Sequence, residues 1–269
     1  QEEDGLRRYV HLGTGNYNPT TAKLYTDLGL MTCRPEYGED AAAVFNLLTG
    51  FCQFEGTTKL MVAPFEFQSR TLELIKRETD YARAGKPARI IAKMNSLVDK
   101  PVIEALYEAS QAGVKIDLVV RGICCLRPGV QEFSPTITVR SIVDRFLEHS
   151  RIYYFANNDT PEIYVGSGDW MYRNFKKRIE VAFPIEDPAL QSRILDEILP
   201  THLGDNVKAH QLRPDGTYEQ LTSVGTDATV RSQLKFIELS RQAVERPQQD
   251  SLAFTVATAP PENQNQSAA

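Results

Sequence analysis

A pattern of glycine, a hydroxyl residue and glycine occurs twice in this chain, each time followed by a polar residue. The two copies are Leu12-Gly13-Thr14-Gly15-Asn16 and Val165-Gly166-Ser167-Gly168-Asp169. Nine residues beyond each copy stand Tyr25 and Arg178, and two residues further on stand Asp27 and Glu180. Repetition at matched spacing predicts two similar lobes that face one another, with a site between them.

A candidate catalytic histidine precedes the second copy. His149 and Arg151 alternate along a predicted strand ahead of the Gly166-Ser167-Gly168-Asp169 turn. A lone histidine is more often a structural hydrogen-bonding group than a catalyst. The order of histidine, basic residue and small-residue turn, however, resembles the HxK and G-[ST]-x-N pattern of the phospholipase D superfamily. In that superfamily the two motifs bind phosphate and present an imidazole as nucleophile or acid, and this chain carries the variant HxR and GSGD.

Two arginines are candidate phosphate ligands. Arg121 stands at the C-terminal end of a predicted parallel strand, where the ligands of open α/β sheets collect. It could equally be a surface cap, although its planar guanidinium suits oxyanions. Arg178 begins a predicted strand at the repeat position of Tyr25, whereas the two lysines before it fit a solvated face better. His11 lacks a basic residue two positions later, so we expect a packing or polar role for it rather than a nucleophilic one.

Bulk composition limits the classes of protein to consider. The chain has 269 residues and a net charge of −5, so a polyanionic ligand requires a local basic cluster. Its four cysteines form no CxxC pair, and no apolar run approaches the roughly 18 residues of a membrane span. We expect a cytoplasmic protein, with association at a membrane surface left open. The first predicted strand has no preceding partner strand, which favours the C-terminal portion of a longer protein.

Hydrophobic periodicity and turn residues predict a domain boundary near Lys59. Residues 1–59 are expected to end a first domain that is truncated at its N-terminus, residues 60–246 to form a second domain, and residues 247–269 to be a disordered tail. In the first domain we predict strands over 6–12 and 24–31 and a helix over 39–49. In the second we predict helices over 69–84, 100–111, 188–199 and 228–244, and strands over 88–94, 115–120, 136–142, 151–156, 162–165 and 178–184. The strands over 88–94 and 115–120, joined by a helix, are expected to be parallel.

The chain closely resembles the C-terminal part of the type 1 (bacterial) polyphosphate kinase family over residues 6 to 244. Six stretches carry the resemblance, and motifs this long are highly specific. They are Tyr9-Val10-His11-Leu12-Gly13-Thr14-Gly15-Asn16-Tyr17-Asn18, Thr21-Ala22-Lys23-Leu24-Tyr25-Thr26-Asp27, Lys93-Met94-Asn95-Ser96-Leu97-Val98-Asp99, Leu118-Val119-Val120-Arg121-Gly122-Ile123-Cys124, Ser141-Ile142-Val143-Asp144-Arg145-Phe146-Leu147-Glu148-His149 and Gly168-Asp169-Trp170-Met171-Tyr172-Arg173-Asn174.

The resemblance implies an α/β fold of phospholipase D-like mixed sheets with flanking helices, with one truncated lobe and one complete lobe. It implies reversible transfer of the γ-phosphoryl of ATP to inorganic polyphosphate, through a phosphohistidine and with Mg²⁺. Tyr25, Arg121 and His149 resemble the family's ATP-binding residues, and Arg178 resembles a further phosphate contact.

The departure from the family pattern is that no HxK occurs in these residues. The phosphohistidine and the Mg²⁺ ligands are therefore expected upstream, and no metal site is expected here. His149 is then expected to assist transfer by hydrogen bonding or proton donation.

Two functions from different classes remain open. The chain could be the C-terminal part of a polyphosphate kinase, or a catalytically silent module that binds nucleotide or polyphosphate; a phospholipase D-like hydrolase is disfavoured because it also needs HxK. The expected partners are ATP or ADP and polyphosphate, with no nucleic acid and with homo-oligomerisation through the complete protein. If the repeat reading holds, Asn16 and Asp169 should flank one cleft. Tyr25, Arg121, His149 and Arg178 should project into it.

Overall fold

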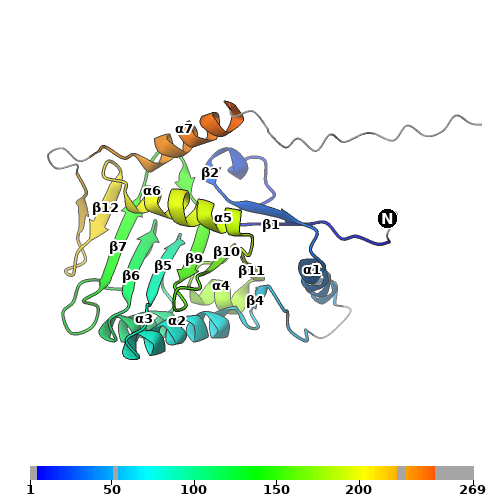
Figure 1. Ribbon diagram of the computed structural model, residues 1–269, viewed down its shortest axis with the longest axis horizontal. Helices are drawn as coiled ribbons and strands as arrows, with labels where there is room; N and C mark the ends of the chain where they lie inside the picture. The colour runs from blue at the N-terminus through cyan, green and yellow to red at the C-terminus, as the bar shows by residue number, and fades with distance from the viewer. Residues whose placement is uncertain (1–4, 51–53, 223–227, 246–269) are drawn as a thin grey trace, which may run out of the picture.

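A computed structural model describes residues 5–50, 54–222 and 228–245 (Figure 1). The tail over 247–269, predicted to be disordered, lies outside the described residues. Nine strands form one mixed sheet: β4 (Met61–Ala63), β5 (Arg89–Met94), β6 (Lys115–Val120), β7 (Ile137–Ile142), β9 (Arg151–Phe155), β10 (Glu162–Gly166), β11 (Glu180–Pro184), β12 (Ala209–Leu212) and β13 (Tyr218–Gln220). Their order across the sheet is β13-β12-β7-β6-β5-β9-β10-β11-β4.

The centre of the sheet is a β-α-β unit whose bounds follow from the sequence. Strands β5 and β6 are parallel neighbours, and α3 (Lys100–Gln111) connects them. The helix begins where it does because the Asp99 side chain accepts a hydrogen bond from the backbone N–H of Val102 at 3.2 Å. The predicted bounds of α3 and β6 and the parallel pairing are confirmed.

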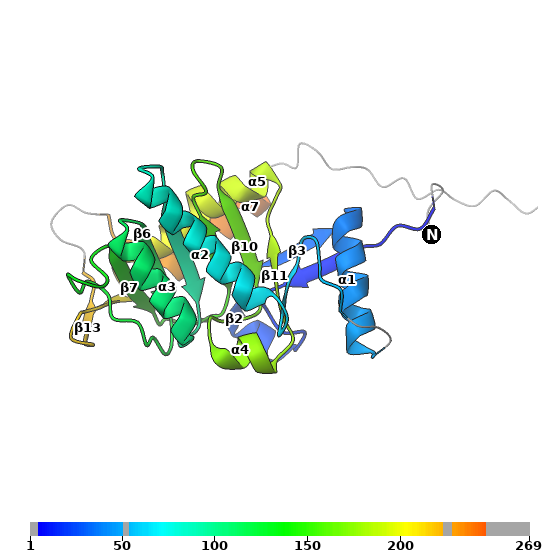
Figure 2. The same cartoon turned by 90° about the horizontal axis from the view of Figure 1, so that it is seen from below.

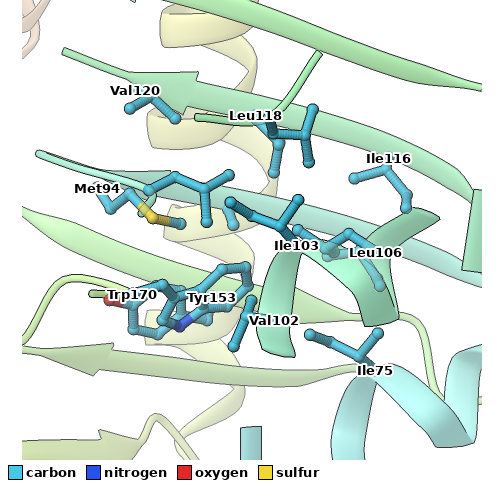
Figure 3. Packing of buried hydrophobic residues seen from close by; sticks show 14 of the residues in the cluster. Ile75, Met94, Val102, Ile103, Leu106, Ile116, Leu118, Val120, Tyr153 and Trp170 are labelled. Atoms are coloured by element: carbon cyan, nitrogen blue, oxygen red, sulfur yellow. The ribbon is translucent and has the colours of Figure 1, made fainter. Parts of the chain in front are cut away.

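Helices cover both faces of the sheet (Figure 2). On one face lie α2 (Phe67–Arg83), α3 and α4 (Tyr172–Lys177), whose apolar residues join the core cluster drawn in Figure 3. The opposite face is covered by one continuous run of α5 (Pro188–Ser192), a π-helical stretch η2 (Arg193–Ile198) and α6 (Leu199–Leu203), whereas α1 (Pro35–Leu48) packs at the β11–β4 edge of the sheet. Successive side chains of β5 point to opposite faces of the sheet. Ile90, Ala92 and Met94 therefore pack in the first core cluster, and Ile91 packs in the second.

The predicted helix over 188–199 is thus longer than expected. The predicted helix over 228–244 begins later, as α7 (Ser232–Glu245), and α4 was not predicted at all. No helix among residues 5–50, 54–222 and 228–245 is long and apolar enough to cross a membrane.

The N-terminal segment contributes two separate strand pairs. Strand β1 (Val10–Gly13) pairs antiparallel with β3 (Gly29–Thr32), whereas β2 (Tyr25–Thr26) follows the short helix η1 (Thr21–Lys23) and pairs in parallel with β8 (Leu147–Glu148). The prediction of a single strand over 24–31 is wrong. The chain changes partner after Thr26, because its backbone leaves β8 to join β1. This break places Asp27 between the two sheets.

Candidate functional site

The two glycine-hydroxyl-glycine turns make equivalent hydrogen bonds. Thr14 Oγ1 donates to Asp27 Oδ1 at 2.6 Å, and Ser167 Oγ donates to Glu180 Oε2 at 2.6 Å. In each copy the residue after the acid returns its backbone N–H to the hydroxyl oxygen, at 3.0 and 3.2 Å respectively. The last glycine of each turn packs on the acid, since a Cβ on Gly15 would lie 2.5 Å from Asp27 Oδ2 and a Cβ on Gly168 would lie 3.0 Å from Glu180 Cβ. Both repeats therefore fix a carboxylate in the same way.

The carboxylate of the first repeat meets the histidine of the second. Asp27 Oδ1 lies 2.8 Å from His149 Nδ1, and the ring centroids of His149 and Tyr25 are 4.6 Å apart. An ionised carboxylate can only accept hydrogen bonds, so Nδ1 carries the ring proton in this pair. No described residue hydrogen-bonds to Nε2, which is left available to a ligand. The His149 side chain is 13% exposed, so it is mostly enclosed but accessible.

Arg151, the basic residue of the HxR motif, is buried and paired. Its Nε and NH2 lie 3.0 and 3.3 Å from the two oxygens of Asp169, and its NH1 donates to the His149 carbonyl at 2.7 Å. Burial alone would lower the pKa of Arg151, but the Asp169 carboxylate outweighs it and raises that pKa. Asp169 therefore balances the charge of Arg151. What Arg151 fixes is the backbone of His149.

Asn95 connects this ion pair to Arg121. The backbone N–H of Asn95 donates to Asp169 Oδ1 at 2.8 Å, and its side-chain Oδ1 accepts from Arg121 Nε at 2.7 Å. The terminal nitrogens of Arg121 have no ion-pair or hydrogen-bond partner among the described residues. Its guanidinium is therefore held at one edge while the other edge is free to bind an anion.

One cavity of about 230 Å³ brings these groups together. All four residues proposed from the sequence, Tyr25, Arg121, His149 and Arg178, line it. Asn16 and Asp169, the polar residues that end the two repeat motifs, line it as well. The geometric convergence expected from the repeat is present, and the roles of these residues toward a ligand stay predictions.

The cavity carries an excess of cationic groups in an acidic protein. Arg121, Arg173 and Arg178 all line it. Arg178 is about half exposed, and its NH1 lies 3.8 Å from Glu180, whose two oxygens already accept hydrogen bonds from Ser167 and Asn174. Such a local cluster meets the condition for binding a polyanion without a positive global field.

The placement of two of the predicted residues differs in detail. His149 lies in the link between β8 and β9, and Arg178 lies between α4 and β11, so neither belongs to a strand as expected. Both still reach the cavity. His11 is exposed, contacts Tyr17 and is absent from the cavity lining.

Several residues of the site were not assigned from the sequence: Asp27, Asn95, Arg173 and Glu180. Two of them could have been found from the matched spacing of the sequence repeat. Asp27 and Glu180 stand at matched repeat positions, and the two lobes were expected to face one another. Asn95 and Arg173 carried no such signal, because their contacts depend on strand ends and on a short helix that periodicity does not reveal.

The residues that the structure describes do not fit a metal centre. Across these residues no group of three or more His, Cys, Asp or Glu side chains could hold a metal ion. The cavity carboxylates already have partners, since Asp27 meets Thr14 and His149 and Asp169 meets Arg151. The expectation that the Mg²⁺ ligands lie upstream stays a prediction.

Family models and curated relatives that match this chain carry the name polyphosphate kinase. A family model described as "Polyphosphate kinase C-terminal domain 2" matches residues 60–233, and one described as "Polyphosphate kinase C-terminal domain 1" matches residues 1–54. A polyphosphate kinase of Thermosynechococcus vestitus is 59% identical over 220 residues, which cover 82% of this chain and 30% of the relative. One from Synechocystis sp. is 54% identical over 236 residues, covering 88% of this chain and 32% of the relative. The chain thus spans about a third of the length of these relatives.

The fold matches a solved structure of the same kind. The crystal structure of a polyphosphate kinase from Porphyromonas gingivalis superimposes with a TM-score of 0.84 at 39% identity, over 88% of this chain and 36% of that one. The predicted α/β fold of mixed sheets with flanking helices is confirmed.

Proposed function

This chain belongs to the polyphosphate kinase family, and we propose that it forms the C-terminal part of an enzyme that reversibly transfers the γ-phosphoryl of ATP to inorganic polyphosphate. The observation that carries the proposal is the convergence of Tyr25, Arg121, His149 and Arg178 on one cavity built from both repeats. The proposal places the nucleophilic histidine in the part of its relatives' length that this chain does not span. The chain alone is then expected to be inactive.

In this proposal the arginines supply electrostatic stabilisation. Phosphoryl transfer spreads negative charge over the oxygens of the transferring group, and preorganised cations stabilise that charge best in a partly enclosed site. Arg121 contributes its free guanidinium edge, and Arg173 and Arg178 contribute further charge to the cavity lining. Tyr25 is assigned a contact with the nucleotide, beside the ring of His149.

His149 is assigned the proton chemistry. Asp27 holds the proton on Nδ1 and stabilises the imidazolium form, so Nε2 can hydrogen-bond to the transferring group or donate a proton to an oxygen as its bond to phosphorus breaks. The phosphoryl group itself moves to a nitrogen of the nucleophilic histidine, with ADP as the leaving group. Mg²⁺, when bound, would neutralise phosphate charge; its ligands are proposed to lie outside the described residues.

The remaining expectations about partners belong to the same proposal. ATP or ADP and polyphosphate are the proposed substrates, and assembly into a homo-oligomer through the complete protein stays a prediction. So do a cytoplasmic location and the absence of a nucleic-acid partner.

Replacing Arg121 with lysine in the full-length protein tests the phosphate role. The substitution keeps the charge but removes the planar fork, because the three donors of lysine all sit on one nitrogen and cannot bond Asn95 while presenting two parallel N–H groups to phosphate. We expect a loss of roughly 1.5–3 kcal/mol of transition-state stabilisation, which is a roughly 10- to 150-fold fall in kcat/KM for ATP. Steady-state kinetics of polyphosphate synthesis measure this.

The matched control is Arg213→Lys, which changes an arginine paired with Glu219 outside the cavity. It should leave kcat/KM unchanged. Wild-type kinetics in Arg121→Lys would show that Arg121 only caps a strand end. A wild-type full-length protein that binds ATP yet transfers no phosphoryl group would instead favour a silent binding module.

A further inference from the structure

The position of His149 depends on a very short strand. Strand β8 has two residues, and β2 pairs with it at only two positions, Tyr25 with Leu147 and Thr26 with Glu148. The same pairing sets the places of Tyr25, Asp27 and His149. Two ladder positions provide little rigidity on their own, so other contacts must hold this segment.

Those contacts come from Gln233, the second residue of α7. Its Oε1 accepts from the backbone N–H of Phe146 at 2.9 Å, and its Nε2 donates to the Phe146 carbonyl at 2.9 Å and to Glu148 Oε1 at 2.7 Å. Gln233 is only 3% exposed. One buried amide therefore bonds both backbone groups of Phe146 and the side chain of Glu148, in the segment that leads to His149.

Glu148 is in turn fixed from the centre of the sheet. Its Oε2 lies 3.1 Å from Lys93 Nζ on β5 and accepts from Thr26 Oγ1 at 3.2 Å. Lys93 Nζ also donates to the Ser150 hydroxyl at 2.8 Å, on the other side of His149. Both neighbours of His149 are thus tied to a single lysine, and all of these side chains except Thr26 are buried.

The charge states of this cluster are consistent with one ion pair. Burial alone would raise the pKa of Glu148, but the charge of Lys93, together with the hydrogen bonds from Gln233 and Lys93, outweighs it and lowers that pKa. Burial, followed by the charge of Lys93, lowers the pKa of His202 to about 3, so this histidine is neutral at physiological pH. Burial lowers the pKa of Lys93, and Glu148 opposes that shift. Replacing a buried ion pair with apolar side chains is often neutral for stability, so stability alone is a weak reason for such a pair.

We propose that Gln233 and Glu148 are positioning residues that hold His149 against Asp27 and Tyr25, so that docking of α7 orders the site. The expected effect of these residues on activity rests on the proposed function. Their expected effect on the position of His149 does not. Neither residue is among those that line the cavity. They act through the segment that precedes the histidine, and through Lys93 on Ser150, which follows it.

An exchange of the amide and the carboxylate tests the proposal in the full-length protein. Gln233→Met removes all three hydrogen bonds at similar volume and should lower kcat about 100-fold, the scale of loss expected when a reacting group is misplaced by about an ångström. Gln233→Glu and Glu148→Gln should each also lower kcat. The double variant restores a donor and acceptor pair between positions 233 and 148 and the charge of the cluster, although it lacks a donor to the Phe146 carbonyl. It should therefore recover kcat in part, at least about tenfold over the weaker single variant. The control, Gln242→Met, lies on the exposed part of α7 and should keep wild-type kcat.

The second readout does not require activity. The ring ¹⁵N shifts of His149 can be assigned in the full-length protein by comparison with a variant in which His149 is substituted. Wild-type His149 should show the Nδ1-protonated tautomer, and Gln233→Met should lose that signature at a temperature where circular dichroism shows a folded protein.

Three results would each overturn the positioning role. Activity could fall only in proportion to the unfolded fraction, the double variant could show no recovery, or the His149 signal could be unchanged in Gln233→Met. If the proposed function is wrong, the wild-type protein shows no ATP-dependent transfer. The ¹⁵N shifts then still decide whether Gln233 positions His149.

Discussion

Asp27→Asn in the full-length protein is expected to lower kcat for polyphosphate synthesis by roughly 100- to 10,000-fold, the range contributed by general acid–base catalysis. The carboxylate accepts the Nδ1 proton of His149 at 2.8 Å and thereby leaves Nε2 free for the ligand. An asparagine can present its amide N–H to Nδ1 instead, which moves the ring proton to Nε2. It also removes the charge that stabilises the imidazolium.

Single-turnover kinetics at saturating ATP measure this effect, and thermal melting checks that the variant is folded. Because Thr14 still holds residue 27 through its hydroxyl group, we expect ATP affinity to change far less than kcat. Asp80→Asn is the matched control, since Asp80 pairs with Lys76 on the exposed side of α2. If Asp27→Asn retained wild-type kcat, the contact between Asp27 and His149 would be structural only.

Glu180→Gln is expected to lower formation of the phosphorylated protein by about 100-fold or more. The reason is the repeat: Ser167 holds Glu180 as Thr14 holds Asp27, at the same 2.6 Å. Asp27 meets the histidine of the other lobe, so the same relation places Glu180 against the nucleophilic histidine that we propose for the upstream part. Loss of that carboxylate would leave the nucleophile in the wrong tautomer.

Rapid quench with γ-labelled ATP, followed by measurement of acid-labile protein-bound phosphate, tests this directly. Glu219→Gln removes an exposed carboxylate that pairs with Arg213 and should leave labelling unchanged. Normal labelling in Glu180→Gln would mean that the pseudo-symmetry of the turns does not extend to the two histidines.

The elements with strong local signals were predictable from the sequence. Helix α3 has an Asp99 cap, a proline in its first turn and an apolar face, and its bounds agree with expectation. The stretch over 24–31 was not predictable, because its division into β2 and β3 depends on pairing between Tyr25 and Leu147, far apart in the chain. Hydrophobic periodicity contains no information on such long-range partners.

The site was predictable to the extent that the repeat encodes it. Matched spacing brought Tyr25 and Arg178 to one cavity, and motif resemblance added Arg121 and His149. The neutralisation of Arg151 by Asp169 was not predictable, because an HxR motif and a GSGD turn do not reveal that their charged residues form a buried ion pair. The same holds for Asn95, which reaches Arg121 only through the ends of two adjacent strands.

Locating the phosphorylated histidine is the most direct test of the proposed function. Full-length protein and the 269-residue chain are each incubated with γ-labelled ATP and Mg²⁺, and acid-labile phosphate is quantified and mapped by mass spectrometry under alkaline conditions. We predict stoichiometric phosphohistidine in the full-length protein at a residue outside this chain, and no label on the chain alone. Stoichiometric label on His149 would contradict this prediction, because His149 would then be the nucleophile itself. Label on His11 would contradict it as well, because His11 does not line the cavity.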